Sequence, residues 1–286
     1  MKQKIFILFL LLTLIVPLSR AQSDLESIFS KESFTLGQSS LPYRKAEVLH
    51  DTSMKPALVL YLHGGSSRGN DNETQLKENA VNVIYQYLLD NDISATFIVP
   101  QCPSGGGWTS QNRRVVNELL KRYIQTEQAD PDRVYIMGGS MGGTGTWCQL
   151  SYYPNFYAAA MPVAGNPTGC DAANVATTPV LTVMGSADAM MSIDDVEYFM
   201  TDVIAAGGTI QLDIEQGWSH PITCEQSYTK ERLDWLFSHT KSTDTGIQPS
   251  VTIDNKVTPL YNLQGVRVED NYRGVIIKEG RKVLRK

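Results

Sequence analysis

The segment Arg133–Gly143, with the sequence RVYIMGGSMGG, decides how this 286-residue chain is interpreted. Its apolar first half predicts a buried strand, and the residues that follow it predict a helix, so a G-x-S-x-G pattern lies at the turn. Gly138 and Gly142 leave the room that such a tight turn needs, and Ser140 is held at its tip. The segment therefore predicts a serine nucleophile exposed between a strand and a helix.

Strand-like and helix-like segments alternate from Ala46 to about His239. The expected strands are 57–63, 96–100, 133–137, 159–163, 179–184 and 209–214, and the expected helices are 73–89, 115–125, 144–152, 194–204 and 228–239. Such alternation predicts a mostly parallel sheet covered by helices. Combined with the serine turn, it predicts an α/β class protein with the α/β-hydrolase fold and a small C-terminal β appendage.

The order of catalytic groups in this fold selects the histidine, because serine comes first, then an acid, then histidine. His50 and His63 precede Ser140, and His239 closes the last expected helix. His220 remains, in the segment Gly-Trp-Ser-His-Pro, which we expect to be an exposed loop. We therefore predict that His220 is the general base.

The acid is expected just past the strand 179–184, because the chemistry of open α/β sheets gathers at the carboxyl ends of the strands. Asp188 lies there. Asp194 and Asp195 are closer to the start of the next helix, where acidic side chains stabilise the helix N-terminus. Asp188 is the predicted acid, and Asp194 or Asp195 is the alternative.

Two backbone N–H groups are expected to form the oxyanion hole. The residue after the nucleophile, Met141, supplies one, and Gly65 in the His-Gly-Gly-Ser segment supplies the other. His63 in that segment is then structural, with its imidazole bonded to the loop backbone.

Several large side chains fall in loops at the same edge of the sheet and are candidates for the substrate pocket. They are Trp108, Trp218, Met190 and Met191. Ordinary packing beneath the loops is the alternative interpretation for each of them.

Composition narrows the partners and cofactors. The net charge is −5, and the part of the chain before the C-terminal tail is more acidic still, which argues against nucleic acid and anionic membranes as partners. The four cysteines have no C-x-x-C spacing, so no zinc site is expected. The predicted chemistry requires no metal and no cofactor.

The cysteines are Cys102, Cys148, Cys170 and Cys224, and four cysteines allow three pairings. Cys170 and Cys224 both fall in expected loops after strands, which makes them one candidate disulfide. Cys148 lies on the helix after the nucleophile and reads as a small buried hydrophobe.

The N-terminus predicts a secretory signal peptide over residues 1–21, because two lysines precede an apolar run too short for a membrane span and small residues follow it. The catalytic domain is expected over 22–240, and a polar linker over 241–250. Residues 251–286 form a basic, strand-like tail that is too short to bury a core of its own. No stable membrane anchor is expected.

The chain resembles secreted serine esterases related to feruloyl and acetyl-xylan esterases and to poly(3-hydroxyalkanoate) depolymerases. The residues that carry the resemblance are LHGGSSRGNDNETQL, VPQCP with Trp108 beyond it, and DPDRVYIMGGSMGGTGTW, and it covers about residues 40–240. It implies hydrolysis of carboxylic esters, often acyl groups on plant polysaccharides. Two departures, Met190-Met191-Ser192 after the acid and Pro221 after His220, affect the substrate rather than the mechanism.

The tail from Tyr261 resembles the C-terminal segments of proteins exported by type IX secretion systems, which implies contact with secretion machinery. A β appendage that covers part of the catalytic domain is the alternative.

The expected activity is that of a secreted serine esterase acting on an acylated polysaccharide or oligosaccharide through Ser140, His220 and Asp188. A serine peptidase with the same triad is the first alternative. A non-catalytic binding module built on a hydrolase scaffold is the second.

Overall fold

The computed structural model describes residues 25–126, 128–241, 260–262, 267–268, 274–278 and 281–285. The expected signal peptide, 1–21, lies outside the described residues, and so does the expected linker apart from Lys241. Lys241 still contacts the body, because its N–H donates to the carbonyl of Asp132.

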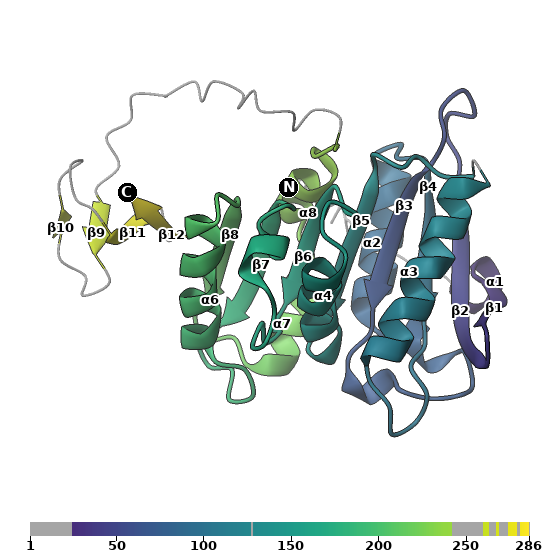
Figure 1. Cartoon of the computed structure of the whole chain (residues 1–286), viewed down its shortest axis with the longest axis horizontal. Helices are drawn as coiled ribbons and strands as arrows, with labels where there is room; N and C mark the ends of the chain where they lie inside the picture. The colour runs from purple at the N-terminus through teal and green to yellow at the C-terminus, as the bar shows by residue number, and fades with distance from the viewer. Residues whose placement is uncertain are drawn as a thin grey trace, which may run out of the picture.

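One twisted sheet runs through the body, in the order β1-β2-β4-β3-β5-β6-β7-β8 (Figure 1). The strands from β4 to β8 in that order are parallel, whereas β1 and β2 are antiparallel additions at one edge. The body strands are β1 (Ser30–Leu36), β2 (Ser39–Val48), β3 (Ala57–Leu62), β4 (Ala95–Pro100), β5 (Val134–Gly139), β6 (Ala159–Val163), β7 (Val180–Gly185) and β8 (Ile210–Glu215).

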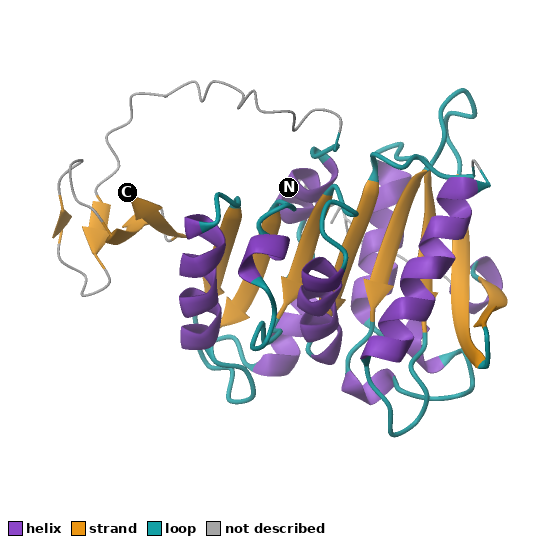
Figure 2. Ribbon diagram, viewed as in Figure 1, coloured by secondary structure: helices purple, strands orange, loops and turns teal. Residues whose placement is uncertain are grey.

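Helices cover both faces of this sheet, as Figure 2 shows in purple and orange. The α-helices are α1 (Leu25–Ile28), α2 (Asn79–Asp90), α3 (Ser110–Gln125), α4 (Met141–Tyr152), α5 (Ala172–Val175), α6 (Ile193–Ala205), α7 (His220–Gln226) and α8 (Lys230–Phe237), and the short 3₁₀ turns are η1 (Gly65–Ser67) and η2 (Thr74–Lys77). Parallel strands with helices on both faces confirm the predicted α/β class of fold.

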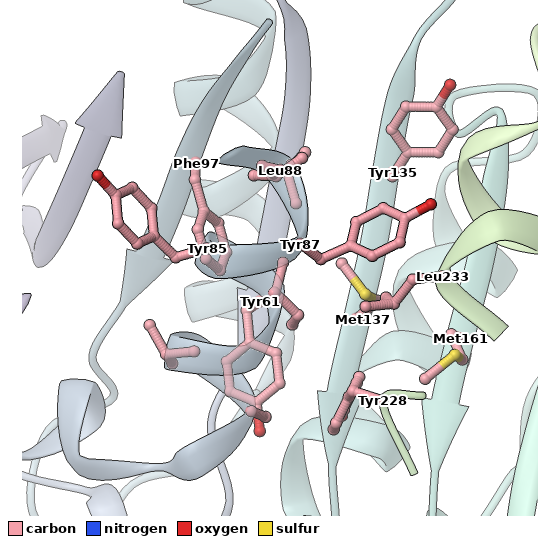
Figure 3. Close-up of a cluster of buried hydrophobic side chains, with 14 of the residues drawn as sticks. Tyr61, Tyr85, Tyr87, Leu88, Phe97, Tyr135, Met137, Met161, Tyr228 and Leu233 are labelled. Carbon is pink, nitrogen blue, oxygen red and sulfur yellow. The ribbon is translucent and has the colours of Figure 1, made fainter. Parts of the chain in front are cut away.

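Two apolar cores lie on opposite faces of the sheet. One packs α2 and α8 against the sheet, and Figure 3 shows its aromatic side chains, among them Tyr61, Tyr135 and Tyr228. The other packs α3, α4 and α6, with Trp147 at its centre. Because the central strands are covered on both sides, every residue of β3 to β7 is buried, as their nearly continuous apolar sequence predicts.

The expected helix 73–89 is divided in the structure. Its first turn is the 3₁₀ segment η2, and α2 begins after Glu78, whose ψ of 124° is extended rather than helical. The helical periodicity of the sequence did not reveal this interruption, because the reason for it is a tertiary contact of the Glu78 side chain.

Two further elements differ from the expectation. Helix α3 begins at Ser110 rather than near residue 115, because the Thr109 hydroxyl caps it by accepting from the N–H of Asn112. The hairpin of β1 and β2 was missed, since β1 is largely exposed and its sequence lacks a buried face.

The tail contains the described strands β9 (Leu260–Asn262), β10 (Arg267–Val268), β11 (Gly274–Lys278) and β12 (Arg281–Arg285). Figure 1 shows them in yellow beyond β8. Strand β12 joins the body by pairing antiparallel with β8 at Lys282 and Leu212. The tail therefore extends the edge of the sheet that lies farthest from β1.

Candidate active site

The turn between β5 and α4 has the geometry of a strained nucleophile elbow. Ser140 adopts a φ of 57° and a ψ of −118°, a conformation that costs energy for a residue with a side chain. A Cβ atom on Gly142 would lie 1.7 Å from the carbonyl oxygen of Leu62, and one on Gly138 would lie 2.6 Å from the backbone of Gly142. Both glycines are therefore required sterically, and Ser140 lies at the turn, where it is partly exposed and lines a cavity.

The structure brings Ser140, His220 and Asp188 together in one hydrogen-bonded line. The Nε2 atom of His220 lies 2.8 Å from Ser140 Oγ, and its Nδ1 atom lies 2.7 Å from Asp188 Oδ2. The ionised carboxylate only accepts hydrogen bonds, so Nδ1 carries the proton and Nε2 is free to accept one from the serine. This is the proton path that a serine nucleophile needs.

Asp188 is anchored so that one carboxylate oxygen remains for the histidine. Its Oδ1 atom accepts from the N–H groups of Met190 and Met191 at 2.8 and 3.0 Å. Its side chain is fully shielded from solvent. Asp194 and Asp195, the alternative acids, lie instead in the first turn of α6, as expected for charges at a helix N-terminus.

His220 does not lie in an exposed loop, and that expectation is wrong. It is the first residue of the short helix α7 and is 8% exposed. Pro221 follows it in the first turn, where a residue without an N–H group loses no helical hydrogen bond. Pro221, which is one of the two differences from the resembled esterases, thus lies in the first turn of the helix that begins with His220.

The two expected oxyanion donors are the first residues of η1 and α4. Gly65 begins η1 and Met141 begins α4, so neither N–H group has an acceptor within its own helix. Gly65 and Ser140 line the same cavity. Met141 is not among the residues that line the cavity, although it follows Ser140 directly.

His63 orients the peptide group that carries the Gly65 N–H. The Nε2 atom of His63 accepts from the N–H of Cys102 at 2.9 Å, so Nδ1 bears the proton and donates to the Gly64 carbonyl at 2.7 Å. A trans peptide is planar, and its N–H points opposite to its carbonyl. Holding the Gly64 carbonyl thus fixes the direction of the Gly65 N–H.

Burial lowers the pKa of His63 to about 4, so its imidazole is neutral at physiological pH. The structure therefore gives His63 the backbone-bonding position that was expected from the sequence.

Sequence reasoning missed the polar residues that support this loop. The hydroxyl of Thr74, followed by the N–H of Glu73, holds the pKa of Asp71 well below its usual range. Gln101, at the end of β4, donates to Asp71 and accepts from the N–H of Asn72. These hydrogen bonds connect the loop after β3 to the residue that follows β4. The spacing of the residues along the sequence does not reveal them.

A cavity of about 840 Å³ opens beside Ser140 and His220. Its volume lies within the usual range for a ligand site. The wall includes Arg68, Lys77 and Met190, and Met190 is 70% exposed. A substrate can therefore approach the serine through a partly open, mixed polar and apolar surface.

The remaining pocket candidates lie elsewhere. Trp108 is 5% exposed, contacts the His63 ring at a tilted angle and donates its indole N–H to the His63 carbonyl, so it supports the loop. Trp218 is half-buried and does not line the cavity, and Met191 packs against the core that contains α6. Of the four residues, the structure places Met190 at the cavity.

The cysteine neighbours differ from the candidate pairing. Cys170 Sγ lies 3.9 Å from Cys148 Sγ, whereas Cys224 Sγ lies 4.0 Å from His220 Nε2 on the other side of the nucleophile turn. All four thiols are free in the structure. The neighbour of Cys170 is thus Cys148 and not Cys224.

Metal-ligating residues do not gather in the part of the chain that the structure describes: no cluster of three or more His, Cys, Asp or Glu side chains has the geometry to hold an ion. None of the described helices is long and apolar enough to cross a bilayer.

Comparison with known proteins adds a family match over residues 105–242, which correspond to the dienelactone hydrolase family. Acetylxylan esterase A of Emericella nidulans is 36% identical over 67 residues, a stretch that covers 23% of this chain and 21% of the fungal protein. The chain therefore spans only about a fifth of that curated relative.

Solved structures show the same fold. A thermostable esterase matches with a TM-score of 0.68 and 24% identity over 75% of this chain and 64% of its own. A feruloyl esterase module from Clostridium thermocellum, in complex with sinapinate, matches with a TM-score of 0.54 and 16% identity over 73% and 87% of the two chains.

Peptidases share the architecture as well. The acylaminoacyl peptidase of Pyrococcus horikoshii matches with a TM-score of 0.57 and 14% identity over 77% of this chain and 43% of its own. The chain thus has the α/β-hydrolase fold, and residues 105–242 match the dienelactone hydrolase family.

Proposed function

We propose that the protein is a serine esterase that hydrolyses carboxylic esters through Ser140, His220 and Asp188. The observation that carries this proposal is the unbroken line from Asp188 Oδ2 through the imidazole to Ser140 Oγ, with hydrogen-bond distances of 2.7 and 2.8 Å. A structural histidine would not need both a buried carboxylate behind it and a strained serine in front of it. The arrangement supports acyl transfer rather than simple binding.

The reaction begins when His220 Nε2 takes the proton of Ser140 Oγ and the oxygen attacks the ester carbonyl. The N–H groups of Met141 and Gly65 stabilise the negative charge that forms on the carbonyl oxygen. Protonated His220 then gives its proton to the leaving alcohol, which leaves an acyl group on Ser140. Water, deprotonated by His220, releases the carboxylic acid and restores the serine.

Asp188 keeps the imidazole in the tautomer that this sequence of steps requires. Its carboxylate accepts from Nδ1–H and stabilises the imidazolium that forms after each proton transfer. The Met190 and Met191 N–H groups prevent the carboxylate from turning away.

The proposed substrates are acyl esters, feruloyl or acetyl, on plant polysaccharides. The short match to acetylxylan esterase A supports this class, and so does a cavity large enough for an aromatic acyl group or a sugar unit. We further propose that the protein is secreted, which is consistent with the signal-like N-terminal sequence. The tail would then contact the export machinery.

A panel of substrates tests the proposal with the purified mature protein. We expect turnover of p-nitrophenyl acetate and methyl ferulate, release of acetate or ferulate from acylated xylan oligosaccharides, and negligible cleavage of peptide anilides. Faster turnover of peptide anilides than of every ester would identify a peptidase. No turnover on any of these substrates, together with no fluorophosphonate labelling of Ser140, would favour a binding module.

A further inference from the structure

A partly buried carboxylate, that of Glu78, supports the loop after β3 that supplies the Gly65 N–H and also lines the cavity beside Ser140. Glu78 Oε1 accepts from the N–H of Gly64 at 2.7 Å and from the Ser67 hydroxyl at 2.6 Å. Glu78 Oε2 accepts from the Tyr61 hydroxyl at 2.7 Å. The Glu78 side chain thus contacts the end of strand β3, the beginning of the loop and the end of η1.

These contacts fix the loop from the side opposite to His63. Glu78 holds the N–H of Gly64, and His63 Nδ1–H holds the carbonyl of the same residue. The peptide group that follows this carbonyl contains the N–H of Gly65. With both ends of Gly64 held, the Gly65 N–H cannot rotate away from the cavity without breaking at least one hydrogen bond.

The local fold gives up regular structure to place this carboxylate. Glu78 is the N-cap residue of α2, yet its side chain makes no hydrogen bond to the N–H groups of that helix. The shorter side chain of an ordinary N-cap residue, such as Ser or Asp, satisfies one of them. Here the extended backbone of Glu78 interrupts the helix and directs the carboxylate to the loop.

No cation pairs with Glu78 among the described residues, and hydrogen-bond donors compensate for its burial instead. The hydroxyls of Tyr61 and Tyr228 and the thiol of Cys224 lie near Glu78, and all three are neutral acids. Arg68 and Lys77 line the same cavity as Glu78, but neither forms an ion pair with it. Burial raises the pKa of Glu78, and the donors Ser67, Tyr61 and Gly64 oppose that rise. Burying a carboxylate without a counter-ion costs stability. A role in the site accounts for a glutamate at this position despite that cost.

We propose that Glu78 is a positioning residue for the oxyanion hole, acting through Gly64 and Ser67. The inference rests on the proposed esterase function. The oxyanion hole stabilises negative charge that develops on the carbonyl oxygen only in the transition state. Loss of Glu78 therefore lowers kcat and leaves KM nearly unchanged.

Three variants separate the effect of the length of the Glu78 side chain from the effect of its charge. Glu78→Gln keeps the length of the side chain and an oxygen that can accept from Gly64, whereas Glu78→Asp keeps the charge but is too short to reach. Glu78→Ala removes both. We expect kcat on p-nitrophenyl acetate to fall about 100-fold in Glu78→Ala, which is at the lower end of the effect of deleting one oxyanion donor. Glu78→Asp should be similarly impaired, and Glu78→Gln should retain most of the activity.

Glu118→Ala is the matched control, because Glu118 lies on α3, does not line the cavity and pairs with Lys121. It should leave kcat and KM unchanged. A boronic acid inhibitor provides a second readout, since its adduct with Ser140 places an oxygen in the oxyanion hole. Its inhibition constant should rise in parallel with the loss of kcat.

Several outcomes would overturn the inference: kcat for Glu78→Ala within threefold of wild type, a loss confined to KM, or more activity in Glu78→Asp than in Glu78→Gln. If Glu78→Ala does not fold, the comparison of the Gln and Asp variants still decides between reach and charge. Absence of ester turnover in the wild type would instead contradict the proposed function itself.

Discussion

At the scale of single residues, the site depends on how each reactive side chain is held. Asp188 is held by two backbone N–H groups, His220 by Asp188, and Ser140 by the strained turn of β5 into α4. Each group restricts the next, so the geometry of the nucleophile depends on a residue that never touches the substrate.

Asp188→Asn tests this dependence. In this variant the amide oxygen stays with the Met190 and Met191 N–H groups, so the NH2 group faces His220 Nδ1 and donates to it. The imidazole then takes the wrong tautomer, and kcat should fall by roughly 10⁴-fold. Steady-state ester hydrolysis measures the effect. Asp194→Asn and Asp195→Asn serve as controls and should be nearly silent, because they remove only charges at the start of α6. A severe loss in either control, with a nearly silent Asp188→Asn, would move the acid to α6.

The sequence predicted the residues that bear the chemistry better than those that support them. Ser140, His220 and Asp188 follow from a tight glycine turn and from a fixed order along the chain. Glu78 follows from neither rule, because its role arises from contacts with Tyr61, Gly64 and Ser67 that only the folded chain creates. The position of Trp108 in the sequence predicted a place in the substrate pocket. In the structure Trp108 is buried and supports the loop after β3.

At the scale of secondary-structure elements, α4 begins directly after Ser140 and contains Cys148, one of two neighbouring thiols. Cys148 on α4 and Cys170 before α5 are 22 positions apart, and their sulfur atoms lie 3.9 Å from each other. The two thiols are neighbours in the fold, and a disulfide requires their sulfur atoms to approach to about 2 Å. The pair can therefore link α4 to the segment that leads into α5.

Oxidised glutathione should convert these two thiols into a disulfide, with two molecules of reduced glutathione as the product. Closing a loop of this length stabilises a protein by about 3 kcal/mol, so the melting temperature should rise. Peptide mapping under non-reducing conditions identifies the bond, and calorimetry measures the shift. Cys148→Ser should abolish both effects, and Cys224→Ser should preserve them. A Cys170–Cys224 bond would contradict the observed neighbours.

The elements themselves were predictable where they are long and buried. The strands from β3 to β8 follow from apolar runs, and their boundaries agree with the expectation to within a residue or two. The exceptions are short or depend on tertiary contacts. Helix α7 has only seven residues and begins at His220. The 3₁₀ turn η2 is separated from α2 by Glu78, whose side chain contacts the loop after β3.

At the scale of the whole molecule, the described strands of the tail meet the body at the edge strand β8. The contact of β12 with β8 involves Lys282 and Leu212, whereas Asp188 and His220 follow β7 and β8 at their carboxyl ends. The tail therefore adds to the sheet without contributing a described residue to the site.

Deletion of 251–286 should leave kcat on a soluble ester unchanged, because the triad and its supporting loop belong to the body. In the native host the truncated protein should accumulate in a different compartment if the tail is an export signal. Fractionation and activity assays measure both outcomes. A truncated protein that aggregates or melts at a much lower temperature would favour a structural appendage, and unchanged export of a folded one would contradict the sorting role.

The central claim is that Ser140, activated by His220 and Asp188, attacks an ester. The most direct test is kcat for p-nitrophenyl acetate with wild type and Ser140→Ala, since alanine fits the elbow and removes only the nucleophilic oxygen. The account predicts a folded variant with nearly all turnover lost, the residual rate reflecting the remaining site. Turnover by Ser140→Ala within tenfold of wild type would contradict it.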